Sequence, residues 1–128
     1  MANHEPIQGE LQEQIMRVLW RLEKGRVGEV RDALPKRHRS AYTTVQTVLN
    51  RLAERGLLDR EREGKAIVYK PRISEAEYLS GSLDRALTGI SGEARRTAIA
   101  HLVGGLDKSE QREIQTMAQE IARRRRSS

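Results

Sequence analysis

Cysteine is absent from the 128-residue sequence, which excludes disulfides, thiol catalysis and cysteine-based metal sites. Aromatic residues are scarce, with one Trp, three Tyr and no Phe, so a pocket for an aromatic ligand is poorly supported. No apolar run is long enough to span a bilayer, and the first residues, MANHEPIQGE, lack the basic and apolar parts of a signal peptide. We therefore expect a cytoplasmic protein with no membrane insertion.

Positive charge is what the sequence does have, and it is concentrated in two places. Residues 36–72 carry 10 basic and 4 acidic side chains, a net of +6. By contrast, residues 1–35 (5 basic, 6 acidic) and 73–122 (5 basic, 8 acidic) are net acidic, and the closing RRRRSS adds +4. A localised basic region indicates a polyanionic partner such as nucleic acid. A charge run by itself is also typical of a solvated surface.

Apolar residues at spacings of three and four predict helices in the first part of the chain. These helices span residues 10–23, 27–34 and about 41–55. Gly25 is expected to end the first helix as a C-terminal cap, and Ser40 to cap the start of the third.

The apolar period then changes to that of strands. Residues 57–62 and 66–70 are short strand-like runs on either side of Glu63-Gly64-Lys65, which we interpret as a three-residue hairpin connection. Because a lone hairpin is marginally stable, it must pack on the helices. Three helices followed by a hairpin are the order of a winged helix-turn-helix, which we assign to residues 1–72.

Three further helices are predicted for residues 73–122, separated by Ser91-Gly92 and Gly104-Gly105. Capping boxes open two of them, at 74–77 and 107–110. Three short amphipathic helices bury little by themselves, so we expect this region to complete its core against a second copy of the chain. Residues 123–128 are expected to be a disordered basic tail. The predicted fold class is mainly α with a small β-hairpin (α+β).

The third predicted helix carries an unusual polar face in the stretch AYTTVQTVLNRL. Its outer side chains are short, uncharged hydrogen-bonding groups at the start and cationic at the end. In a helix-turn-helix the last helix enters the major groove, where threonine and glutamine bond base edges and arginine reaches guanine or a phosphate. The residues expected to read bases are Thr43, Thr44, Gln46, Thr47 and Arg51. Capping and solvent exposure are the plainer explanation for each threonine taken singly.

A second group of side chains is expected to hold the DNA backbone. Contacts to phosphates fix the register of a protein on DNA without reading its sequence. The residues assigned to these contacts and to the wing are Arg39, Tyr42, Arg60, Arg62, Lys65 and Lys70.

The stretch AYTTVQTVLNRLAERGLL, followed by GKAIVYKP, resembles the signature of the penicillinase-repressor family, which includes the methicillin-resistance repressor. The resemblance implies a homodimeric winged-helix repressor that binds double-stranded DNA at a pseudo-palindromic operator. It also implies that the C-terminal helices dimerise. The residues that the resemblance assigns to dimer contacts are Leu79, Leu83, Leu87, Ile99, Leu102, Ile114, Met117 and Ile121.

The chain differs from that family at the site where some of its members are cleaved. Members under the control of a β-lactam sensor are cleaved between an asparagine and a phenylalanine, where this chain has His101-Leu102. A sensor-linked protease therefore stays an open partner, and so does the inducing signal. The cysteine-rich copper site of other relatives is absent.

No cofactor or metal is expected, because His4, His38 and His101 lie far apart, and no catalytic constellation suggests an enzyme. Two alternatives to a sequence-specific repressor are kept. One is a winged-helix module that docks on proteins without reading DNA. The other is a repressor gated by a small molecule.

Overall fold

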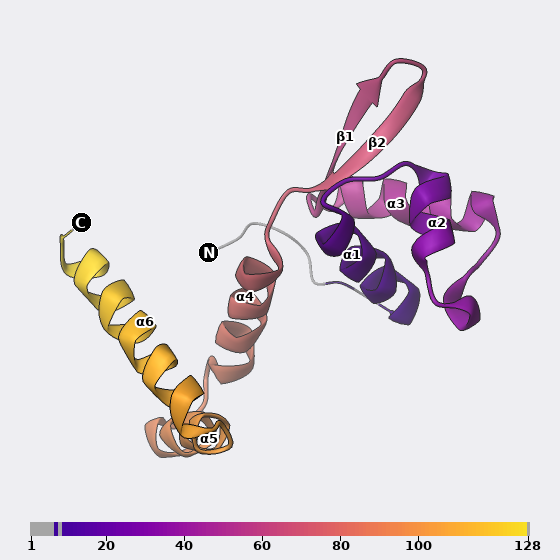
Figure 1. Ribbon diagram of the computed structural model, residues 1–128. Coiled ribbons are helices and arrows are strands. Elements are labelled where there is room, and N and C mark those ends of the chain that lie inside the picture. The colour runs from indigo at the N-terminus through magenta and orange to yellow at the C-terminus, as the bar shows by residue number, and fades with distance from the viewer. Residues whose placement is uncertain (1–6, 8, 128) are drawn as a thin grey trace. The chain divides into compact units, whose positions relative to one another are not determined.

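The computed structural model describes residue 7 and residues 9–127 of the chain, which are six α-helices and one β-hairpin in the order shown in Figure 1. The chain divides into two compact units, and the boundary falls between Ala86 and Leu87. The predicted fold class, a mainly helical chain with a winged helix-turn-helix and a small hairpin, is confirmed.

The winged helix-turn-helix occupies most of the first unit. Its elements are α1 (Glu10–Leu22), α2 (Val27–Ala33), α3 (Tyr42–Glu54), β1 (Leu58–Glu63) and β2 (Ala66–Pro71), with a 3₁₀ turn at Lys36–His38. The two strands pair antiparallel and extend beyond the helices as a narrow wing (Figure 1).

One apolar core holds these elements together. The apolar stripes predicted for the first and third helices supply much of it, with Val45, Val48, Leu49 and Leu52 as the buried side of α3. Tyr69 of β2 is the largest side chain in this core, and only 1% of it is exposed. Burial of this kind is the main driving force for folding, so the core fixes α3 and the wing relative to each other.

The connection between α1 and α2 differs from the expectation. The left-handed residue that ends α1 is Glu23, at φ 74°, and not Gly25. Gly25 is buried and forms a bridge with Tyr69, with N–H to O distances of 3.0 and 2.8 Å. A Cβ on Gly25 would lie 3.2 Å from Val30 Cγ2. The glycine therefore leaves room for the Val30 side chain, which is a different use of the same residue.

The hairpin connection is one residue shorter than predicted. Glu63 pairs with Ala66, so only Gly64 and Lys65 lie between the strands. Gly64 adopts φ 63°, which suits a two-residue hairpin turn with glycine in first place. Lys65 therefore lies at the tip of the wing.

The remaining helices are α4 (Glu75–Leu87), α5 (Gly92–Gly104) and α6 (Lys108–Ser127). The predicted capping box at the start of α4 is confirmed, because Glu77 N–H donates to Ser74 Oγ at 3.0 Å and Ser74 N–H donates to Glu77 Oε1 at 3.2 Å. At the start of α6, Glu110 N–H donates to Asp107 Oδ1 at 2.8 Å.

Residues 123–127 continue α6 as helix, where a disordered tail is expected from the sequence. Cationic side chains in a last turn interact favourably with the negative end of the helix dipole. The sequence feature interpreted as a frayed end is therefore compatible with a longer helix.

The first turn of α4 packs on α1 through two aromatic rings. The ring centroids of Trp20 and Tyr78 lie 5.8 Å apart, Trp20 Nε1 donates to Ile73 O at 3.0 Å, and Tyr78 Oη accepts from Ile7 N at 2.8 Å. Within the described residues, no helix combines the length and the apolar character that crossing a membrane requires.

Candidate nucleic-acid interface

The polar face of α3 is open to solvent along its length. The five side chains assigned to base reading, Thr43, Thr44, Gln46, Thr47 and Arg51, are all exposed. The opposite face of the helix is buried in the core, so α3 can rotate little about its axis. The helix thus presents a fixed row of short polar groups ending in a cation.

Thr47 already uses its hydroxyl proton within the helix. Its Oγ1 donates to the carbonyl of Thr43 at 2.9 Å. In this arrangement the methyl group and the lone pairs of Thr47 are left for a partner. A thymine methyl or a base-edge donor would match them.

The start of α3 lacks the serine cap expected from the sequence. The N-cap residue is Ala41, which has no capping side chain, and the Ser40 carbonyl instead accepts from Arg31 Nε at 2.7 Å. The first amides of α3 are therefore not satisfied by a side-chain cap. Such amides favour an anion.

Alternation along β1, LDRERE, gives the wing two faces of opposite charge. Residues directly opposite in an antiparallel pair share a face, and alternate residues along a strand lie on opposite faces. Arg60 pairs with Tyr69 and Arg62 with Ile67, so these arginines lie on the face from which Tyr69 reaches α3. Tyr69 Oη donates to Asn50 Oδ1 of α3 at 2.7 Å.

The other face of the wing is acidic. It carries Asp59, Glu61 and Glu63 of β1 together with Lys70, which pairs with Asp59. The structure thus separates Lys70 from the other wing cations, although sequence reasoning grouped them. The period of two along the strands, combined with their register, was the signal that could have separated them.

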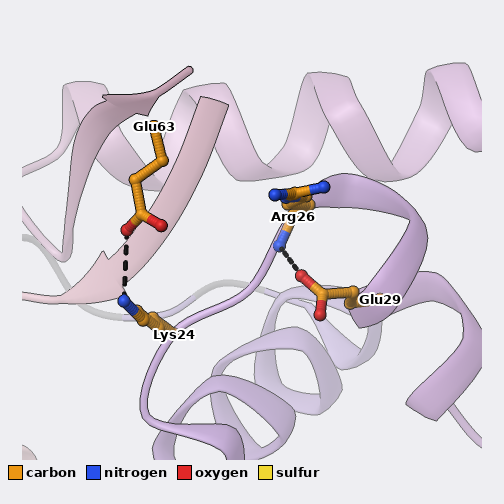
Figure 2. Close-up of polar contacts among 4 residues, drawn as sticks. All are labelled: Lys24, Arg26, Glu29 and Glu63. Atoms are coloured by element: carbon orange, nitrogen blue, oxygen red, sulfur yellow. Dashed lines mark hydrogen bonds and ion pairs between the residues drawn. The ribbon is translucent and has the colours of Figure 1, made fainter. Parts of the chain in front are cut away.

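Two ion pairs join acidic side chains of this face to basic residues outside the two strands. Lys24 Nζ lies 3.1 Å from Glu63 Oε2, and Arg72 Nη2 lies 2.7 Å from Asp59 Oδ1. Figure 2 shows the first pair, which joins the wing to the connection between α1 and α2. The same figure shows the Arg26 N–H donating to Glu29 Oε1 at 2.9 Å, which satisfies an amide at the start of α2.

One of the residues predicted to contact the DNA backbone, Arg39, has partners within the protein. The guanidinium of Arg39 donates to the carbonyls of Asp32 and Leu34, both at 2.9 Å, and so closes the end of α2. Tyr42, the first residue of α3, is 52% exposed. Arg60, Arg62 and Lys65 are exposed on the basic face and at the tip of the wing.

The hydroxyl of Tyr69 lies between the wing and α3. Burial raises its pKa above the ordinary value of 10.0, and the charge and hydrogen bond of Arg60 partly offset that rise. Tyr69 and Asn50 are therefore joined by a hydrogen bond, with Arg60 directly opposite Tyr69 in the hairpin. Sequence reasoning did not assign a role to Asn50, although its position seven residues after Thr43 marks the same face of α3.

The residues assigned to dimer contacts are solvent-exposed in the single chain, except Leu87, which is partly buried. None of the described residues in α4, α5 or α6 is buried. The exposed set with its exposed fractions is Leu79 55%, Leu83 52%, Ile99 39%, Leu102 62%, Ile114 44%, Met117 58% and Ile121 54%. The part of the chain that the structure describes contains no cluster of His, Asp and Glu fit for a metal ion.

A family model described as penicillinase repressor matches residues 8–123 of the chain. The chain belongs to the penicillinase repressor family. The match includes α3, the wing and all three C-terminal helices, so family membership extends well beyond the helix motif.

Members of the penicillinase repressor family are also found among the individual relatives. Over 97 residues the chain is 37% identical to the transcriptional regulator BlaI of Mycobacterium tuberculosis, covering 74% of this chain and 70% of that protein. It is 35% identical over 66 residues to the penicillinase repressor of Bacillus licheniformis, covering 52% of each. The solution structure of the DNA-binding domain of the repressor BlaI is 32% identical, covers 59% of this chain and 93% of that one, and has a TM-score of 0.49.

Proposed function

We propose that this protein is a transcriptional repressor that reads a specific operator in double-stranded DNA as a homodimer. The observation that carries the proposal is the exposed polar face of α3 beside the basic face of the wing. Membership of the penicillinase repressor family supports it, as does the identity with a protein named a transcriptional regulator.

In this proposal the two parts of the interface have different tasks. Thr43, Thr44, Gln46, Thr47 and Arg51 contact base edges in the major groove, and Arg60, Arg62 and Lys65 contact phosphates. Base contacts carry the sequence information, whereas phosphate contacts fix position and give the salt dependence of binding.

The acidic face of the wing limits how the protein approaches DNA. Asp59, Glu61 and Glu63 would meet phosphates with the same sign of charge if the wing were turned over. Lys70 lies among them and contributes less to binding than Lys65. The wing therefore has one productive orientation, with Arg60 and Arg62 toward the DNA.

In the proposed repressor, a second copy of the chain packs against the C-terminal helices. Amphipathic helices need a partner for their apolar side, and most of the large apolar residues of α4, α5 and α6 lie exposed in the single chain. A twofold dimer presents two α3 helices to half-sites about one helical turn apart. The functional division is then residues 1–72 for DNA and 73–122 for dimerisation.

Selection of binding sites from a random duplex pool tests the function. A twofold-symmetric consensus is expected, because each protomer reads one half-site. Thr47→Ala or Gln46→Ala should then relax the preference at one base pair of each half-site, by about 1–3 kcal/mol. No enriched sequence would contradict the proposal and favour a protein-docking module.

The wing is tested with a matched pair of lysines. Lys65→Ala should weaken binding to all sequences alike and lower the salt slope by about 1. Lys70→Ala removes the same charge from the other face, so its effect should be smaller. Equal losses from the two variants would contradict the proposed orientation of the wing.

A further inference from the structure

We propose that Asn50 donates a hydrogen bond from its amide nitrogen to an acceptor atom of the bound DNA, and that Tyr69 holds the amide in the orientation this requires. The inference rests on the proposed function. It adds a contact at the junction of α3 and the wing, and it states which kind of DNA atom that contact recognises.

The position of Asn50 supports such a contact. It follows Thr43 by seven residues and Thr47 by three, so the three side chains lie along one face of α3. Unlike the threonines, Asn50 is partly buried, because it lies against the wing. It is therefore within the proposed interface and held more firmly than its neighbours.

The direction of the hydrogen bond follows from the chemistry of the two groups. A tyrosine hydroxyl has a single proton to donate. Arg60 lies directly opposite Tyr69 in the hairpin, and its positive charge acts on the hydroxyl. The hydroxyl gives its single proton to Asn50 Oδ1, at 2.7 Å.

This bond removes the usual freedom of an asparagine amide, which can present either oxygen or nitrogen to a partner. With Oδ1 turned to Tyr69, the Nδ2 group is left as a pair of donors. Within the described residues no side-chain bond of Nδ2 is found. Tyr69 is buried in the core, so the bond is anchored at its tyrosine end.

A donor pair at this position recognises acceptors. Phosphate oxygens, guanine O6 and N7, thymine O4 and adenine N7 all qualify, whereas the amino group of cytosine does not. The two-pronged bond to adenine that asparagine often makes is disfavoured, because it needs Oδ1 as well as Nδ2. The recognised chemistry is thus an acceptor oxygen or nitrogen on the DNA.

Three variants separate this contact from a purely structural bond. Asn50→Ala removes both sides of the amide. Asn50→Asp keeps the oxygen for Tyr69 but has no donor, and Tyr69→Phe keeps the amide but removes its anchor. Operator affinity is measured for each full-length variant at two salt concentrations, because the added charge of Asn50→Asp is screened at the higher one. Circular dichroism and thermal melting of each variant report the fold.

Asn50→Ala and Asn50→Asp should each lose about tenfold in operator affinity, and the loss in Asn50→Asp should persist at the higher salt. Tyr69→Phe should lose less, because the amide is still present. A loss concentrated at one base pair identifies a base acceptor, and a loss equal over all sequences identifies a phosphate oxygen.

Wild-type affinity in Asn50→Ala would overturn the inference. So would a Tyr69→Phe variant that loses as much as Asn50→Ala while Asn50→Asp binds normally at the higher salt, because only the structural bond would then matter. If Asn50→Ala fails to fold, Asn50→Asp decides. If the wild type still selects an operator sequence, any of these failures contradicts the role of Asn50 and not the proposed function. A wild type that selects no sequence contradicts both.

Discussion

The winged helix-turn-helix and the C-terminal helices use similar building blocks with opposite results. The helices α1, α3, α4 and α5 each contain 13 residues. Yet every buried apolar side chain described lies between Ile15 and Ile73. Helix length therefore does not decide burial. The availability of other elements within the same chain does, since α3 packs beside two helices and a hairpin.

Similar leucines have different environments in the two regions. Leu49 of α3 is 0% exposed and belongs to a core that one chain completes. Leu83 of α4 is 52% exposed in the single chain, and the proposed dimer would cover it.

A charge in the apolar row of α4 should cause the largest effect. Leu83→Asp is expected to give monomers, because a carboxylate cannot be buried in an apolar interface without a partner. Losing the second DNA-reading domain should reduce operator affinity by about 10²–10⁴-fold. Sedimentation and operator titration measure the two effects.

Gly81→Asp is the matched control for that charge. Gly81 lies on another side of α4, and the nearest atom to an added Cβ is Arg85 Nη1 at 3.4 Å. This variant should remain dimeric. A Leu83→Asp protein that sediments as a dimer would contradict the dimer proposal.

Truncation of a core leucine should cost less than loss of the dimer but more than any surface change. Leu49→Ala should lower the free energy of unfolding by about 2–5 kcal/mol, because it leaves a cavity in a closed core. The matched truncation Leu102→Ala removes a side chain that is 62% exposed. Its effect should change with protein concentration, as expected for an interface. Concentration dependence in Leu49→Ala and none in Leu102→Ala would reverse the comparison.

Alkaline pH should weaken the winged-helix part through Tyr69. Its pKa is raised in the folded protein by burial, with Arg60 acting in the opposite direction. The folded state therefore holds this proton more tightly than the unfolded state. The corresponding stability is present below about pH 10 and is lost as the pH rises through the folded-state pKa. Denaturant unfolding of the wild type and Tyr69→Phe across this range should show a steeper loss in the wild type. Parallel curves would contradict the assignment.

The smallest effect is expected at the ion pair drawn in Figure 2. The side chains of Lys24 and Glu63 are 59% and 42% exposed, so water and salt screen their attraction. Lys24→Ala should change the free energy of unfolding by no more than about 1 kcal/mol. Glu63→Gln, which breaks the same pair from the other side, should agree. A larger loss would mean that the pair positions the wing as well as stabilising it.

Much of the fold was predictable from the sequence because its signals are local. Apolar spacing predicts α1 and α3, and the change to a period of two predicts the hairpin. The exposed polar face of α3 follows from the same helical spacing that predicts its buried face.

What could not be predicted depends on contacts between distant residues. A glycine after a helix usually caps it, and only the packing of Val30 beside it shows that Gly25 leaves room for that side chain. The orientation of the Asn50 amide depends on its hydrogen bond with Tyr69, which follows it by 19 residues. The position of Lys70 was within reach of sequence reasoning, but it needed the strand register and not only the number of positive charges.

The strict alternation of charge along β1 makes the sign of the wing depend on a single count of residues. Inserting or deleting one residue in a strand moves each later side chain to the other face. A slip of that kind before Asp59 would turn Asp59, Glu61 and Glu63 toward the side now held by the arginines. Composition and net charge would barely change, yet a surface that attracts phosphates would repel them. The length of this strand is thus as much an electrostatic property as a geometric one.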